Sequence, residues 1–329
     1  MESRRHPARF RIATDGWVRA GLFAVLAALC GGMPTPVAAQ ASADSAPVAD
    51  RFADYEALVE QTHRDSLATR QRVLRETIAK NSFWIDGNWG DVLWCLSALY
   101  LDERTDEANE RLLRQATVYI EAMRAQETDT AFRPEQKSPK SPWGYFALID
   151  YLRILHLFHA SSEHYPGRLD RETEAAMKEA LWQLIKTKSR VADAALDKLL
   201  VTHGTENHDL TLRPQYYLAA ALFRDDPAFS SRTYDDGHTA EEHYAAYNAY
   251  FRAWPRQRVM VGLWLEMGSD TYQKYSWPAL FNLHELSPDP VVREQFGMLL
   301  DVALVEEAQV SIRGRRGGGR SRAGYGGNG

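Results

Sequence analysis

Residues 202–224 read THGTENHDLTLRPQYYLAAALFR, and this stretch carries the pattern that decides the fold. A break at Gly204 is followed by Thr205, a residue type that often caps helix starts, then by polar residues and an apolar run. The apolar residues recur with helical rather than alternating spacing. The stretch therefore predicts a helix over roughly 208–224, with the polar residues 206–209 in its first turn.

The same helical spacing recurs along most of the chain, and we find no alternating run long enough to predict a strand. Proline and glycine separate the segments, for example at Pro142, Gly237 and Gly268. Helices are predicted over roughly 50–79, 91–101, 105–125, 143–160, 170–188, 191–202, 238–252, 256–267, 273–286 and 290–309. Short connections between so many helices favour antiparallel hairpins.

The predicted fold class is therefore all-α. Our first architecture is an (α/α) toroid of helical hairpins, and the alternative is an irregular helical bundle. No constant sequence period marks the hairpins, so a regular solenoid is not expected.

The two ends of the chain differ from this helical body. Residues 1–41 combine arginines, an apolar run and small residues near Ala39 and Ala41, which predicts a signal peptide. A polar linker over 42–49 and a toroid domain over 50–312 follow. The Gly/Arg-rich residues 313–329 have three interpretations: a basic binding arm, a solvated terminus, or a loop at the edge of a missing C-terminal region. We favour the third, in which the toroid is incomplete at its C-terminus.

Composition limits the function. The chain has 329 residues, of which 45% are hydrophobic, so it can bury a large core. Its net charge is −5, with arginines concentrated at both ends, so a nucleic-acid partner is not expected. The predicted signal peptide implies a secreted or periplasmic protein, with no stable membrane insertion after cleavage. Cleavage would leave Cys95 as the single cysteine and exclude an internal disulfide.

The start of the 208–224 helix is the first candidate site. Glu206, Asn207, His208 and Asp209 lie where free backbone N–H groups favour an anionic ligand, and Arg213 follows one turn later. Such a group of residues suits recognition of a carboxylate. The alternative is simple helix capping by Thr205 and the acidic residues, which leaves the Asn and His together unexplained.

A second cluster surrounds a predicted helix break at Gly268. Tyr272 and Tyr275 open the next helix on nearby faces, and Glu266 precedes the break. A tyrosine at such a position can accept and donate a proton. The flanking Trp264 and Trp277 have the usual spacing of core aromatics.

These two clusters and the 312–322 segment resemble exported, mostly uncharacterised α/α-toroid proteins related to heparinase II/III-like and alginate-lyase-like polysaccharide lyases. The resemblance covers roughly residues 80–329. It implies that Asn207 and His208 engage a uronate carboxylate and that Tyr272 is the proton acceptor and donor. The chain departs from the family pattern at Glu206 and in lacking the β-sandwich that often follows the toroid.

This resemblance implies a lyase that cleaves a uronate-containing polysaccharide by β-elimination, with an acidic polysaccharide or oligosaccharide as partner. The catalytic candidates are Asn207, His208, Tyr272 and Arg213. The substrate-binding candidates are Glu206, Trp89, Trp143, Glu266 and Tyr275, since tryptophans at helix starts could stack on pyranose rings. No metal and no other cofactor is expected, because no metal-binding or phosphate-binding motif is present.

Two other functions stay open. A toroid glycoside hydrolase would need two facing carboxylates, which Glu206 or Asp209 could supply together with Glu266 or Asp270. A non-catalytic glycan-binding protein would keep the cleft but lack a complete proton relay.

Overall fold

The computed structural model describes residues 55–80, 88–128, 147–264, 273–312 and 315–316. The described helices are α2 (Tyr55–Lys80), α3 (Asn88–Leu101), α4 (Thr105–Thr128), α5 (Leu148–Phe158), α6 (Arg171–Ile185), α7 (Glu206–Arg224), α8 (Ala240–Val261), α9 (Gln273–Leu286) and α10 (Pro290–Gln309). Two short 3-10 helices, η3 (Val191–Ala194) and η4 (Leu196–Lys198), precede α7. The predicted signal peptide, the linker and most of the Gly/Arg-rich segment lie outside the described residues.

The fold class is all-α, as predicted. Within the described ranges, β-structure is limited to a minimal antiparallel hairpin of β1 (Ser311–Ile312) and β2 (Arg315–Arg316). No helix in this part of the chain is both long enough and apolar enough to cross a membrane.

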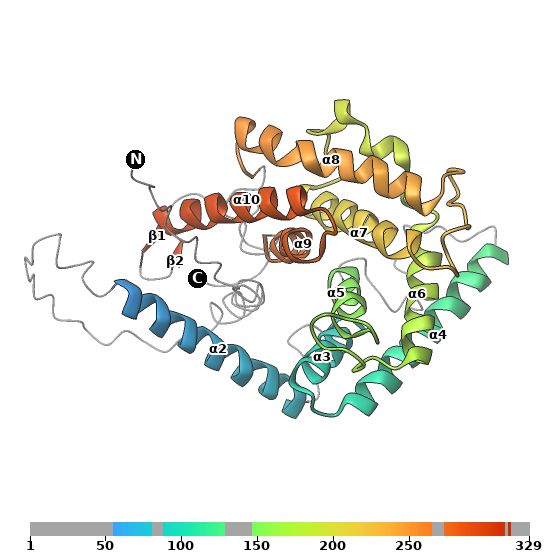
Figure 1. Cartoon of the computed structure of the whole chain (residues 1–329), viewed down its shortest axis with the longest axis horizontal. Coiled ribbons are helices and arrows are strands. Elements are labelled where there is room, and N and C mark those ends of the chain that lie inside the picture. The colour runs from blue at the N-terminus through green and yellow to red at the C-terminus, as the bar shows by residue number, and fades with distance from the viewer. Residues whose placement is uncertain (1–54, 81–87, 129–146, 265–272, 313–314, 317–329) are drawn as a thin grey trace, which may run out of the picture.

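The helices form two layers (Figure 1). Helices α3, α5, α7 and α9 lie inside an arc formed by α2, α4, α6, α8 and α10. Each inner helix packs against the outer helix that follows it, and α5 also contacts α3, α7 and α9. Along the described residues, the chain therefore alternates between an inner and an outer helix (Figure 1).

Sequence composition explains which helices lie inside. Helix α5 reads LIDYLRILHLF and is apolar on nearly all sides, so it is buried almost along its whole length. Most residues of α7 are also buried. Trp94 and Trp182 are core residues, as predicted, and Trp182 packs edge-on against Phe223 and Tyr234.

Two helix predictions were wrong. The predicted helices 238–252 and 256–267 are one helix, α8, with Pro255 inside it. Pro255 removes a backbone donor, but burial of Trp254 and Pro255 against the neighbouring helices offsets that loss. The predicted helix 191–202 is instead the two short turns η3 and η4.

Candidate functional site

The start of α7 has an unusual arrangement of side chains. Thr205 occupies the N-cap position, as predicted, but its side chain makes no capping hydrogen bond. Its hydroxyl instead donates to Oδ1 of Asn207 at 2.6 Å. The first backbone hydrogen bond of the helix runs from the Asp209 N–H to the Thr205 carbonyl at 3.0 Å. The three preceding N–H groups belong to the helix end where positive charge concentrates.

Asn207 is the most informative residue of this helix start. It is only 1% exposed, and within the described residues its amide Nδ2 has no hydrogen-bond partner. A buried donor without a partner costs about 1–3 kcal/mol, and native proteins rarely tolerate one without a water or ligand to receive it. Because Thr205 holds the amide oxygen, the free end of Asn207 is its donating NH₂ group.

The charged residues around α7 form two buried ion pairs. Arg258 of α8 donates through Nη2 to Glu206, and both side chains are 5% exposed. One turn further along α7, Arg213 Nε lies 3.2 Å from Asp209 Oδ1. Each arginine is therefore matched by a carboxylate from the first turn of α7.

Arg213 is a buried residue that links α7 to its neighbours. It donates to the Tyr250 hydroxyl and, at 3.1 Å, to the Val201 carbonyl. Burial raises the pKa of Asp209, although the nearby Arg213 acts to lower it. Burial also raises the pKa of Tyr250 to about 12, against the opposing effect of Arg213. Tyr250 therefore stays a neutral phenol.

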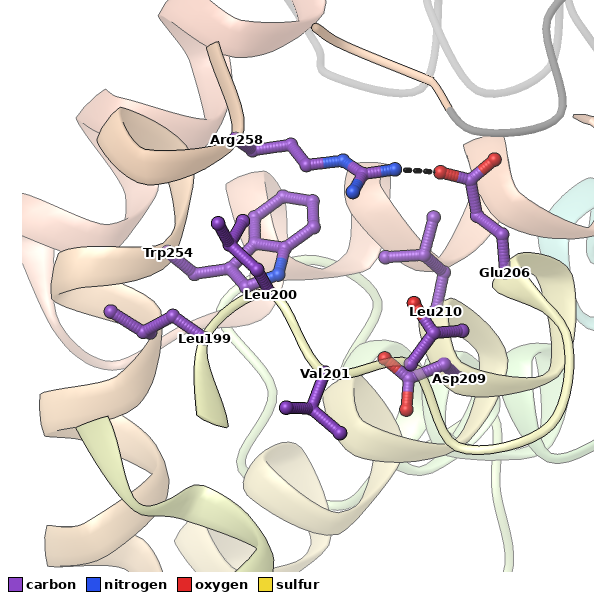
Figure 2. A pocket seen from close by; sticks show the side chains of 9 residues that line it. Leu199, Leu200, Val201, Glu206, Asp209, Leu210, Trp254 and Arg258 are labelled. Atoms are coloured by element: carbon purple, nitrogen blue, oxygen red, sulfur yellow. Dashed lines mark hydrogen bonds and ion pairs between the residues drawn. The ribbon is translucent and has the colours of Figure 1, made fainter. Parts of the chain in front are cut away.

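A small pocket lies beside the Arg258–Glu206 pair (Figure 2). Apolar side chains and the charged Arg258–Glu206 pair surround it, and it has room for about one water molecule. Its lining residues are Leu199, Leu200, Val201, Thr202, Glu206, Asp209, Leu210, Trp254 and Arg258. The segment that follows η4, the first turn of α7 and the C-terminal half of α8 thus meet at one place. Sequence analysis did not anticipate Trp254 here, because it ended a helix just before Pro255.

The chain matches no protein-family model, no curated protein and no solved structure. Among the described residues, no group of three or more His, Cys, Asp or Glu side chains could hold a metal ion.

Most of the other predicted site residues lie outside the part of the chain that the structure describes. His208 is half-buried in the first turn of α7, beside Asn207. Trp143, Glu266 and Tyr272 lie outside the described residues, and the side chain of Tyr275 at the start of α9 is not described either. The structure therefore brings Glu206, Asn207, His208 and Arg213 together.

Trp89 lies at the start of α3 and reaches a neighbouring helix. Its indole N–H donates to Asp150 Oδ2 in the first turn of α5 at 2.8 Å. Burial raises the pKa of Asp150 to about 6, while Trp89 and Arg153 both act to lower it. Sequence analysis missed Asp150, because a single acid in an apolar helix carries no signal of its cross-helix partner.

Proposed function

We propose that this protein is an α/α-toroid polysaccharide lyase that cleaves a uronate-containing polysaccharide by β-elimination. The observation that carries the proposal is the buried Nδ2 of Asn207 at the start of α7, which has no hydrogen-bond partner in the part of the chain that the structure describes. An amide donor at a helix N-terminus is suited to a carboxylate oxygen. The two-layered succession of hairpins supports the toroid part of the proposal.

β-Elimination explains why such a donor is useful. The enzyme must remove the proton at C5 of a uronate, and the neighbouring carboxylate takes up negative charge as that proton leaves. Donors aimed at this carboxylate lower the energy of the enolate-like intermediate. In our proposal Asn207 and His208, in the first turn of α7, fill that role. Tyr272 accepts the C5 proton and protonates the leaving glycosidic oxygen.

The buried ion pairs refine the proposed mechanism. Arg258 and Arg213 are already neutralised by Glu206 and Asp209, so they contribute little net positive charge to a bound uronate. The substrate carboxylate would therefore be held by dipolar groups rather than by an arginine. Arg213 then acts by positioning the first turn of α7, through Asp209 and Tyr250.

The same proposal includes export and recognition of acidic glycans. It rests on the arginines, apolar run and small residues of segment 1–41. An acidic polysaccharide outside the cytoplasm is a reasonable substrate for an exported lyase.

A glycoside hydrolase is the second candidate, and one observation favours it. Asp150, at the start of α5, has a pKa raised to about 6 and accepts a hydrogen bond from Trp89, at the start of α3. A carboxyl group that can hold a proton therefore lies beside an aromatic ring. General acids of glycosidases need such a raised pKa.

Substitutions separate these candidates. For the lyase, we expect Asn207→Ala to lower turnover of the cleaved polymer by about 10²–10³-fold, the usual effect of losing one donor to a developing oxyanion. The matched variant Asn207→Asp keeps the shape but places a carboxylate against the substrate, so it should be at least as defective. Tyr272→Phe should also abolish elimination.

Circular dichroism must first show that each variant is folded. Loss of glycan cleavage in Asp150→Asn or Glu266→Gln, with full activity in Tyr272→Phe, would overturn the lyase in favour of the hydrolase. Equal glycan binding by all variants, with turnover by none, would indicate a non-catalytic glycan-binding protein.

A further inference from the structure

The hydroxyl of Thr205 is not used to cap α7. A threonine at the N-cap position usually accepts from a backbone N–H of the first turn, and Thr205 makes no such hydrogen bond. Asp209 ties the first turn to the preceding loop instead, because its Oδ1 accepts from the His203 N–H at 3.2 Å. Thr205 Oγ1 is therefore available for another partner.

That partner is the side-chain amide of Asn207. The Thr205 hydroxyl donates to Asn207 Oδ1 at 2.6 Å, so the amide oxygen lies beside the N-cap of α7. The N-cap is at the positive end of the helix, which favours the partial negative charge of this oxygen. The NH₂ group is at the other end of the amide, and it is the buried donor that has no partner among the described residues.

The orientation of this amide decides what the α7 start can bind. A half-turn about the last side-chain torsion of Asn207 would exchange the positions of the oxygen and the NH₂ group. Thr205 would then accept from the NH₂ group, but the amide oxygen would lie away from the positive helix end and would repel a bound carboxylate. The Thr205 O–H and the helix end together favour the orientation in which the free group is a donor.

We propose that Thr205 is a positioning residue, which holds the Asn207 amide so that its NH₂ group donates to the carboxylate of a bound uronate. This inference rests on the proposed function, because it takes the ligand of the α7 start to be a uronate. It adds a role for a residue that the sequence marks only as a helix cap.

Thr205 and Thr211 provide a matched pair of variants. Both hydroxyls donate to Asn207, but the Thr211 hydroxyl bonds the backbone carbonyl, at 2.5 Å, rather than the amide. Valine has nearly the shape of threonine and lacks the hydroxyl, so each valine variant removes one of these two bonds. Thr205→Ser keeps the hydroxyl and is the rescue variant.

Calorimetry on the full chain, with oligouronates prepared from alginate, pectin and glucuronan, measures the effect on binding. Circular dichroism and urea unfolding first establish that each variant is folded. We expect Thr205→Val to bind the preferred oligouronate about 10–100-fold more weakly, the range for one hydrogen bond to a charged group. Thr205→Ser and Thr211→Val should stay within about threefold of the wild type, because a threonine bond to a carbonyl one helical turn back contributes little.

NMR spectra of protein labelled with nitrogen-15 asparagine report the amide directly. The side-chain NH₂ signal that is absent from Asn207→Ala belongs to Asn207. At saturating oligouronate this signal should shift in the wild type and in Thr205→Ser, and should shift much less in Thr205→Val. A general loss of structure would not single out this one signal.

The inference is overturned if Thr205→Val binds as the wild type does, if Thr205→Ser is as defective as Thr205→Val, or if Thr211→Val loses as much. Binding of none of the oligouronates by the wild type would overturn it as well. Binding that depends on Thr205, without any unsaturated product, would reject the lyase but keep the role of Thr205. Unsaturated product that Thr205→Val forms at the wild-type rate would keep the lyase and reject that role.

Discussion

The buried pair between Glu206 and Arg258 gives the sharpest test of how the α7 start is held together. Both side chains are 5% exposed, and Arg258 also bonds the Leu263 carbonyl. Replacing Arg258 with methionine leaves the Glu206 carboxylate buried without its partner. Breaking a buried ion pair in this way costs about 3–5 kcal/mol. With a urea m-value of about 3 kcal/mol/M, the unfolding midpoint should fall by about 1–2 M.

A double variant separates the ion pair from simple loss of packing. Glu206→Leu combined with Arg258→Met removes both charges and keeps apolar volume, so its stability should lie within about 1–2 kcal/mol of the wild type. Arg256→Met, on an exposed neighbour in α8, is the control and should change stability by no more than about 0.5 kcal/mol. Urea unfolding followed by tryptophan fluorescence measures all three. The reasoning is refuted if Arg258→Met costs less than about 1 kcal/mol, or if the double variant is as unstable as the single one.

Three further predictions concern buried groups of α5 and of the contact between α9 and α10. Burial lowers the pKa of His156 to about 4, so the folded protein keeps this ring neutral over a pH range in which the unfolded chain protonates it. About 3 kcal/mol of the free energy of unfolding should therefore be lost as pH falls from about 6.5 toward 4. Urea unfolding measured over this pH range should show a smaller loss of stability in His156→Gln. The pKa of Asp150 is instead raised to about 6, so its protonated form favours folding at low pH, and that contribution is lost between about pH 4 and 6. Asp150→Asn should therefore be more stable than wild type by about 1–3 kcal/mol above pH 6 and equal to it below pH 4; the reverse order would contradict the burial argument. Gly297→Ala should lower the thermal midpoint by an amount equivalent to about 1–3 kcal/mol, although alanine favours helix. The new Cβ would lie 2.9 Å from Cε1 of His284, and a 2.8 Å hydrogen bond to the Arg293 carbonyl holds that ring in place. An unchanged or higher midpoint would show that the α9–α10 contact can relax.

Local sequence pattern was sufficient for much of the fold. Helices α9 and α10 have the predicted bounds, because Pro288 and Pro290 separate two strongly apolar segments. The prediction failed at Pro255, where the local signal for a helix end is opposed by burial of Trp254 and Pro255. Such burial depends on helices distant in sequence, so a local pattern cannot reveal it.

At the site too, features that depend on adjacent residues were predicted, and contacts between distant helices were not. The polar turn at the start of α7 was predicted, since glycine, an N-cap residue type and the following polar residues are adjacent in the chain. The pairing of Glu206 with Arg258 joins residues that are 52 positions apart. The bond from Trp89 to Asp150 spans 61 positions. These contacts arise from helix packing, so a local pattern does not reveal that Arg258 and Arg213 are held in ion pairs.

The most direct test of the proposed lyase follows ultraviolet absorbance of the unsaturated product while the full chain is incubated with alginate, heparinoids, chondroitins, pectins and glucuronan. The account predicts a rise with at least one of these polymers, and predicts that Asn207→Ala removes it. No rise with any polymer, or a rise that Asn207→Ala leaves unchanged, would contradict the assignment of β-elimination to the start of α7.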